Sequence, residues 1–414
     1  MQPWERRLRD LARLLQNCGE TYFSPDLFRQ NTNQFLQTSR TVTFIIQKNK
    51  AEIPEYELWY KRHVIDPWGN DEIMKWAKDA RNTIEKEGDL DMHSRLDVAV
   101  IYSHLAQEDI VLETPRPFLL QADINAIAKL AKNSLPPGTL DATVLKIERR
   151  WVANCLPDHE LISALTYIYN SQYKVCEKLA SHLNGKLDAS IPHPSLLDPT
   201  SNDVSRARYI KIGKPNVGKF KTIRVKSDAN YQPPPALYAL KDEIASMPPT
   251  KSLDGLVDKA AKMAHFTFSH DGYHVPMLFL YDDNWNQIDF VTTEFSDQAD
   301  KFIFARNIAK RAAYMKAAAF VFVSETWVRS LDHSGNKPIR DLPVIGEQLQ
   351  LIAGDFTGKL KSVDWNIIRP DQSTKPLLNL SSTQKDSDDV QRIFFVAPLV
   401  EAMKSVRPKS QNTA

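Results

Sequence analysis

The sequence lacks the features that mark secreted and membrane proteins. Its three cysteines, Cys18, Cys155 and Cys176, are scattered and odd in number, which indicates reduced thiols and not a disulfide framework. The longest apolar runs, such as AAAFVFV, are far shorter than the ~18 residues that suggest a membrane span. The amino-terminal stretch MQPWERRLRDLARLL is too charged for a secretory signal. We therefore expect a cytoplasmic protein without a membrane partner.

The sequence also lacks an excess of charge of either sign. Lys and Arg total 53 against 51 for Asp and Glu, so only the local distribution of charge can point to a partner. Hydrophobic residues make up 42% and charged residues 25%, as in ordinary globular proteins. A chain of 414 residues is long enough for two or three domains.

The first 95 residues predict an all-α helical bundle. Apolar residues recur at helical spacing along 3–17, 25–50, 54–66 and 70–88. Ser24 and Pro25 suit the N-cap and the first position of the second helix. Asp66-Pro67 is expected to end the third helix. Four consecutive amphipathic helices with short links are typical of a bundle.

Beyond the bundle, strand and helix patterns mix, which predicts a multidomain α+β protein. The stretches IPHPSLLDPTSND and NYQPPPAL are proline-rich and predict connectors. The stretch LSSTQKDSDD is polar and predicts a mobile end. After the 1–95 bundle we expect a mixed α/β extension with a long helix at 96–185, a proline-rich connector with a basic hairpin at 186–250, an α+β domain at 251–380 and a flexible tail at 381–414.

One helix end, WAKDARNTIEKEGDLDMHS at 76–94, carries a distinctive set of polar residues. Arg81-Asn82 lies near the expected end of the fourth helix, Lys86 follows it, and His93 is the nearest histidine. Together with the helical bundle, this stretch resembles the HEPN family, small helical bundles found in bacterial toxins and antiphage proteins. Active members carry an arginine and, about four to six residues on, a histidine, and cleave RNA without a metal, usually as dimers.

The resemblance implies that Arg81 stabilises charge on a phosphate, while a histidine would move protons. Lys86 stands in place of the family's histidine, and lysine is a poor proton shuttle near neutral pH unless burial lowers its pKa. His93 lies outside the family spacing. Arg81, Lys86 and His93 are thus the candidate catalytic residues, in a degenerate or an active site. An ordinary helix end on which Arg81 pairs with Glu85 is the plain alternative.

A second stretch, GKPNVGK at Gly213–Lys219, resembles the phosphate-binding loop of GTPases and follows the expected strand RYIKI. Phe220 occupies the position where a Ser or Thr hydroxyl should reach magnesium. The residues that follow, KFKTIRVK, alternate with period two, which predicts a strand and not the helix whose first amides would face phosphates. We therefore predict a hairpin with Pro-Asn-Val-Gly as its turn.

This hairpin is strongly basic, with no acidic residue between Ser205 and Ser227. A positive two-stranded ribbon binds phosphate backbones by counterion release, which predicts contact with RNA or DNA. The alternatives are a solvated loop and a ribbon docked on acidic groups of its own chain. The predicted nucleic-acid-binding residues are Arg206, Arg208, Lys211, Lys214, Lys219, Lys221, Arg224 and Lys226.

A histidine-rich stretch, HFTFSHDGYH, contains His265, His270 and His274 around Asp271. Neutral imidazoles are common zinc ligands, but no second group of ligands with suitable spacing accompanies them. A hairpin whose histidines point to different faces is the plainer interpretation. We predict no metal ion and no cofactor.

These patterns together favour a HEPN-like, nucleic-acid-binding component of a prokaryotic defence, toxin–antitoxin or stress-response system, without robust catalysis of its own. A homodimer through the bundle is expected from the resemblance. A metal-independent ribonuclease is one alternative. A scaffold that binds a protein partner through its C-terminal α+β domain is the other.

Overall fold

The computed structural model describes residues 1–101, 110–112, 120–135, 143–194, 197, 206–213, 232, 235–330, 342–370, 375–387 and 396–407. The protein has a multidomain α+β fold, as predicted, with helices in its N-terminal region and two antiparallel sheets. It divides into two compact units, Met1–Pro215 and Asn216–Ala414.

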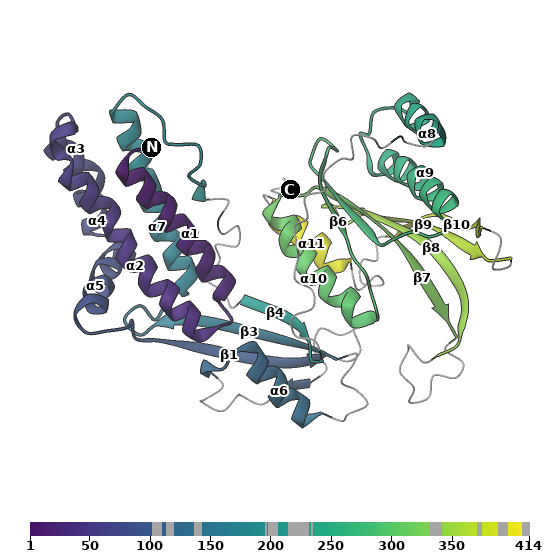
Figure 1. Cartoon of the computed structure of the whole chain (residues 1–414), viewed down its shortest axis with the longest axis horizontal. Helices are drawn as coiled ribbons and strands as arrows, with labels where there is room; N and C mark the ends of the chain where they lie inside the picture. The colour runs from purple at the N-terminus through teal and green to yellow at the C-terminus, as the bar shows by residue number, and fades with distance from the viewer. Residues whose placement is uncertain are drawn as a thin grey trace, which may run out of the picture. The chain divides into compact units, whose positions relative to one another are not determined.

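A helical bundle forms the larger part of the first unit (Figure 1). Its apolar core includes fully buried side chains from distant parts of the chain, such as Leu8, Phe28 and Leu165. The predicted N-terminal helices are present, but the bundle extends beyond residues 1–95 because a later helix packs into the same core. The helices are α1 (Pro3–Thr21), α2 (Pro25–Lys48), α3 (Tyr56–Tyr60), α4 (Asp66–Gly69), α5 (Glu72–Lys86) and α7 (Leu161–His182).

The predicted helix stop at Asp66-Pro67 is wrong. The backbone passes from α3 through a π-helical turn, Lys61–Ile65, directly into α4, and Pro67 lies in the first turn of α4. In a regular α-helix a proline ring clashes with the carbonyl four residues earlier, and a π turn changes that spacing. Helix α5 ends at Lys86, shortly before Gly88, whose positive φ of 126° a helix cannot continue through.

A four-stranded antiparallel sheet completes the first unit, in the order β2-β1-β3-β4. Its strands are β1 (Met92–Ile101), β2 (Ile110–Leu112), β3 (Val144–Ala153) and β4 (Arg206–Lys211). Helix α6 (Ile124–Ser134) packs through Ile127 and Ala131 on Val98, Leu145 and Ile210 of the sheet. The end of β3 enters the bundle core, which fixes the sheet to the helices (Figure 1).

A six-stranded antiparallel sheet forms the centre of the second unit, in the order β10-β9-β8-β7-β5-β6. Helix α9 (Leu253–Asp271) covers one face, and α10 (Gln298–Tyr314) and α11 (Ala397–Ser405) cover the other (Figure 1). A strand covered on both faces has a continuous apolar sequence, which explains AFVFV at the start of β7. The strands are β5 (Met277–Tyr281), β6 (Gln287–Thr292), β7 (Ala319–Arg329), β8 (Val344–Asp355), β9 (Leu360–Ile368) and β10 (Leu377–Ser387).

Two segments of the second unit differ from prediction. The expected connector at 186–250 contains helix α8 (Pro235–Ser246), which packs on α9. Proline is tolerated in the first turn of a helix, where the backbone N–H has no intrahelical acceptor. The expected flexible tail at 381–414 contributes most of β10 and all of α11, whose Leu399, Val400 and Met403 are buried.

Glycine at position 354 of β8 is required by the packing around it. A Cβ there would lie 2.6 Å from Leu360 Cδ2 and 2.7 Å from Phe320 Cε1, both in the core of the second unit. We expect Gly354→Ala to lower the free energy of unfolding by about 1–3 kcal/mol, as overpacked cores do. Denaturant-induced unfolding followed by circular dichroism measures this change.

Gly346→Ala is the matched control on the same strand, because its added Cβ would meet nothing closer than Val328 Cβ at 3.9 Å. We expect that variant to be as stable as the parent or slightly more stable. Equal destabilisation by the two substitutions would contradict this account. It would show that stability is lost through replacing a glycine, and not through a clash of the added Cβ with Leu360 and Phe320.

Candidate nucleic-acid interface

Arg81 is held on the surface of α5 by two neighbours on its own helix. Its Nη2 atom lies 2.6 Å from Glu85 Oε2, and Nη1 donates a hydrogen bond to Asn82 Oδ1 at 3.2 Å. The guanidinium also lies over the ring of Phe44 on α2, with Cζ 5.7 Å from the ring centroid. The pair with Glu85 is the arrangement expected of an ordinary helix end.

A second arginine flanks the same aromatic ring. Arg40 Cζ lies 4.5 Å from the Phe44 centroid, and 41% of Phe44 is exposed. Exposed lysines continue this surface at a spacing of three or four residues, Lys48 after Phe44 on α2 and Lys78 before Arg81 on α5. We call Arg40, Phe44, Lys48, Lys78 and Arg81 the arginine–phenylalanine face.

The arginine–phenylalanine face has the chemistry of a single-strand binding surface. Aromatic rings offer bases a stacking platform, and arginine and lysine side chains attract the phosphates between them. The sequence shows that Arg40 and Phe44 share a face of α2, because they are four residues apart. Their contact with Arg81 depends on the packing of α2 against α5, which sequence spacing alone does not reveal.

The other two candidate catalytic residues lie elsewhere. Lys86 is exposed at the last position of α5, about 140° around the helix from Arg81 at 100° per residue. His93 is exposed on β1, where its Nδ1 atom lies 2.5 Å from Asn154 Oδ1. Among the residues that the structure describes, no contact joins Arg81, Lys86 and His93 into one site.

The described part of the predicted basic hairpin packs on its own chain. Arg206 on β4 lies 3.8 Å from Glu160 Oε2, and its guanidinium stands 5.5 Å from the ring centroid of Tyr22. Arg208 is half-buried, and burial lowers the pKa of its guanidinium. Lys211 is buried. Arg206 therefore fits the expectation of a ribbon docked on an acidic group of its own chain, and the burial of Arg208 and Lys211 argues against a free positive face.

The rest of the predicted hairpin lies outside the described residues. The first four residues of RYIKI lie in β4, and Ile212 and Gly213 lie in the turn that follows it. The remainder of GKPNVGK, with Phe220, falls outside the described residues. So do the other predicted phosphate ligands, Lys214, Lys219, Lys221, Arg224 and Lys226.

Glu160 explains why Arg206 faces inward. The Glu160 carboxylate caps α7 by accepting hydrogen bonds from the Ser163 backbone N–H at 2.9 Å and the Ser163 hydroxyl at 3.2 Å. Glu160 is fully buried, and burial raises the pKa of its carboxyl group despite the opposing effect of Arg206 and these hydrogen bonds. A buried carboxylate requires such partners, so Arg206 stabilises the fold.

The histidine-rich stretch is mostly helical, and the hairpin expected for it is wrong. His265 and His270 lie on α9, and His270 Nδ1 is 2.7 Å from Asp271 Oδ1. His274 follows the helix and is buried, which lowers the pKa of its imidazole. Within the described ranges, no group of three or more His, Cys, Asp or Glu side chains is placed to hold a metal ion.

Comparison with known proteins gives a family for the whole chain. Residues 1–414 match the family described as bacteriophage lambda protein ea47. The chain is 40% identical over 403 residues to "Protein ea47" of Escherichia phage lambda, which covers 97% of each sequence. No solved structure matches the chain. Of the helices in the described part of the chain, none is long and apolar enough to cross a membrane.

The contact between Arg206 and Glu160 leads to a prediction about stability. We expect Arg206→Gln to lower the free energy of unfolding by on the order of 2 kcal/mol at neutral pH, because it leaves a buried carboxylate without its cation. Urea denaturation at several pH values measures this. Arg208→Gln removes the same charge from the same strand and is the control, for which we expect a smaller effect.

The pH dependence separates this mechanism from a general packing defect. The pKa of Glu160 is higher in the folded state than its ordinary value of 4.5. Its protonation therefore contributes fully to stability below pH 4.5, and this contribution is lost as the pH rises through the folded-state pKa. Removing Arg206 raises that pKa further, so the difference between variant and parent should grow with pH and shrink in acid. A loss that is the same at every pH would contradict this role for Arg206.

Proposed function

Since the chain belongs to the bacteriophage lambda ea47 protein family, we propose on that premise that it is a HEPN-like protein that binds RNA or DNA without robust catalysis of its own. The observation that carries the proposal is the arginine–phenylalanine face, in which two guanidiniums flank one exposed ring. Membership of a phage protein family supports a role during infection, where a defence or stress-response component would act.

The face favours single strands over duplexes. A base can stack on Phe44 only if it is unpaired and turned outward, because the faces of paired bases are covered by their neighbours in the duplex. Arg40 and Arg81 flank the ring, and the exposed Lys48 and Lys78 add positive charge on the same two helices. Glu85, which pairs with Arg81, carries the opposite charge. Phosphates bound there would release counterions, which makes binding dependent on salt.

The placement of the candidate catalytic residues favours binding over cleavage. RNA cleavage without a metal needs a proton-transfer group beside the cation that stabilises the phosphate. His93 lies on a different element from Arg81 and contacts Asn154. Lys86 is exposed, whereas lysines that transfer protons near neutral pH are buried ones.

Binding is tested with fluorescently labelled single-stranded RNA and DNA and the whole protein, by anisotropy over a range of salt concentrations. We expect Arg40→Gln combined with Arg81→Gln to reduce the slope of log affinity against log salt by about 1.4, at about 0.7 per phosphate contact on a single strand. Phe44→Ala should cost about 1–3 kcal/mol through the lost stacking. Lys129→Gln, an exposed lysine on α6, is the control and should bind like the parent.

The same samples distinguish the other functions. RNA cleavage in EDTA that is lost in Arg81→Ala and in His93→Ala would replace this proposal by a metal-independent ribonuclease, in which a second copy supplies the missing group. Binding that is unchanged in the Arg40, Phe44 and Arg81 variants would remove the arginine–phenylalanine face from the interface. No binding at low salt would leave a protein-binding scaffold.

A further inference from the structure

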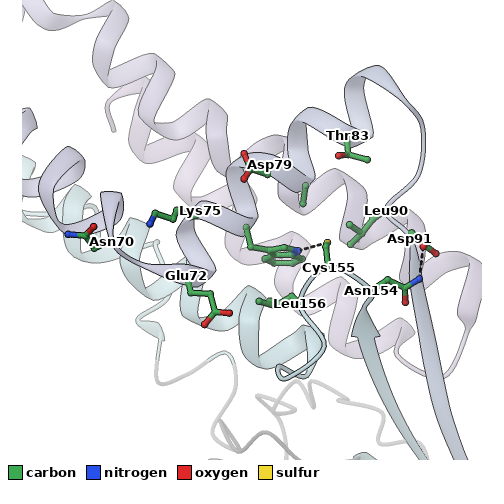
Figure 2. Close-up of a pocket in the computed structure, with 12 residues that line it drawn as sticks. Asn70, Glu72, Lys75, Asp79, Thr83, Leu90, Asp91, Asn154, Cys155 and Leu156 are labelled. Carbon is green, nitrogen blue, oxygen red and sulfur yellow. Dashed lines mark hydrogen bonds between the residues drawn. The ribbon is translucent and has the colours of Figure 1, made fainter.

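One face of α5 lines a pocket of about 550 Å³ in the first unit (Figure 2). Six residues between Glu72 and Thr83 contribute to it at a spacing of three and four, so they fall on one side of the helix. The remaining walls are formed by Asn70 before α5, by Leu90 and Asp91 before β1, and by the turn after β3. Arg81 is absent from this lining, because it lies on the side of α5 that contacts Phe44.

The inner surface of the pocket is apolar. Trp76, Ala80, Leu90 and Leu156 line it, and all four are buried in the bundle core. Cys155, an exposed residue, lies among them, and its Sγ accepts a hydrogen bond from Trp76 Nε1 at 3.1 Å. A dashed line at Cys155 in Figure 2 marks this hydrogen bond. A ligand that enters the pocket therefore meets an indole, aliphatic side chains and a sulfur atom.

The rim of the pocket is mainly acidic. Glu72, Asp79 and Asp91 are exposed around it, against one basic side chain, Lys75. Glu72 and Asp79 are seven residues apart, which is about 10 Å along a helix at 1.5 Å per residue. Asp91 lies on the facing wall, where it accepts a hydrogen bond from Asn154 (Figure 2). The apolar surface thus lies between carboxylates on two walls.

We propose that this pocket binds a small organic cation, a protonated amine carried on an apolar body. The apolar part would displace water from the surface around Trp76, and the ammonium group would donate to the rim carboxylates. The net charge of the rim disfavours anions, so this site is separate from the arginine–phenylalanine face and does not depend on the proposed function. A ligand of about ten heavy atoms should bind with a dissociation constant in roughly the millimolar to high-micromolar range.

Cys155 provides the readout for a test on the whole protein. Cys18 and Cys176 are fully buried, so iodoacetamide should alkylate Cys155 first, and intact mass follows the rate. We expect 2-phenylethylamine to slow alkylation of Cys155 several-fold and 2-phenylethanol, which has the same body without the charge, to leave it nearly unchanged. Cys155→Ala, which should not be labelled, identifies the reacting thiol.

Substitutions at the rim test the role of its charge. For each variant, the alkylation rate of Cys155 with 2-phenylethylamine is divided by the rate without it, so that changes in the reactivity of the thiol itself cancel. Protection should weaken several-fold in Glu72→Gln and in Asp79→Asn and strengthen in Lys75→Gln. It should be unchanged in Glu87→Gln, an exposed acid after α5 that does not line the pocket. Equal protection by amine and alcohol, protection by neither, or protection that the two rim variants leave intact would overturn the proposal.

Discussion

The packing of Trp151 against α2 holds the first unit together. Its ring stacks on Phe28 with centroids 5.2 Å apart, and its Nε1 donates a hydrogen bond to the Tyr22 carbonyl at 2.8 Å. The Tyr22 hydroxyl in turn donates to the Arg149 carbonyl at 2.9 Å. These contacts fix the end of β3 against the bundle. They therefore set where the turn that carries Cys155 meets α5, and they hold β3 and its neighbour β4 beside Glu160.

The two sides of α5 differ in net charge, so a nearly neutral chain presents surfaces of opposite charge on a single helix. Arg81 and Lys78 lie on the side that contacts α2, while Glu72 and Asp79 lie at the pocket on the other side. The net charge of the whole chain is close to zero and does not reveal this local difference. Electrostatic attraction acts over about a Debye length of 8–10 Å, so a ligand responds to the side it approaches.

The sequence predicted those elements whose pattern is set locally. The apolar spacing along 3–17 and 25–50 predicted two helices, and α1 and α2 confirm them. The segments that were missed depend on distant partners. Helix α11 is short and follows a polar stretch, and its burial comes from α10 and the sheet. Arg206 was predicted to bind nucleic acid, and nothing in its neighbourhood along the chain reveals that Glu160 lies beside it. Phe44 was not predicted as a binding residue, because its contact with Arg81 arises only when α2 packs against α5.

The exposure of the acidic partner determines which arginines of the first unit are available to a ligand. The Arg81–Glu85 pair is partly exposed on both sides, at 24% and 39%, and such surface pairs contribute only about 0–1 kcal/mol. A phosphate can therefore replace Glu85 at little cost, and Glu85 then regains its hydration. The Glu160 side chain is 0% exposed, so a phosphate that drew Arg206 away would leave a carboxylate without water or cation. Both arginines are paired in the structure, but only Arg81 can exchange its partner without disturbing the fold.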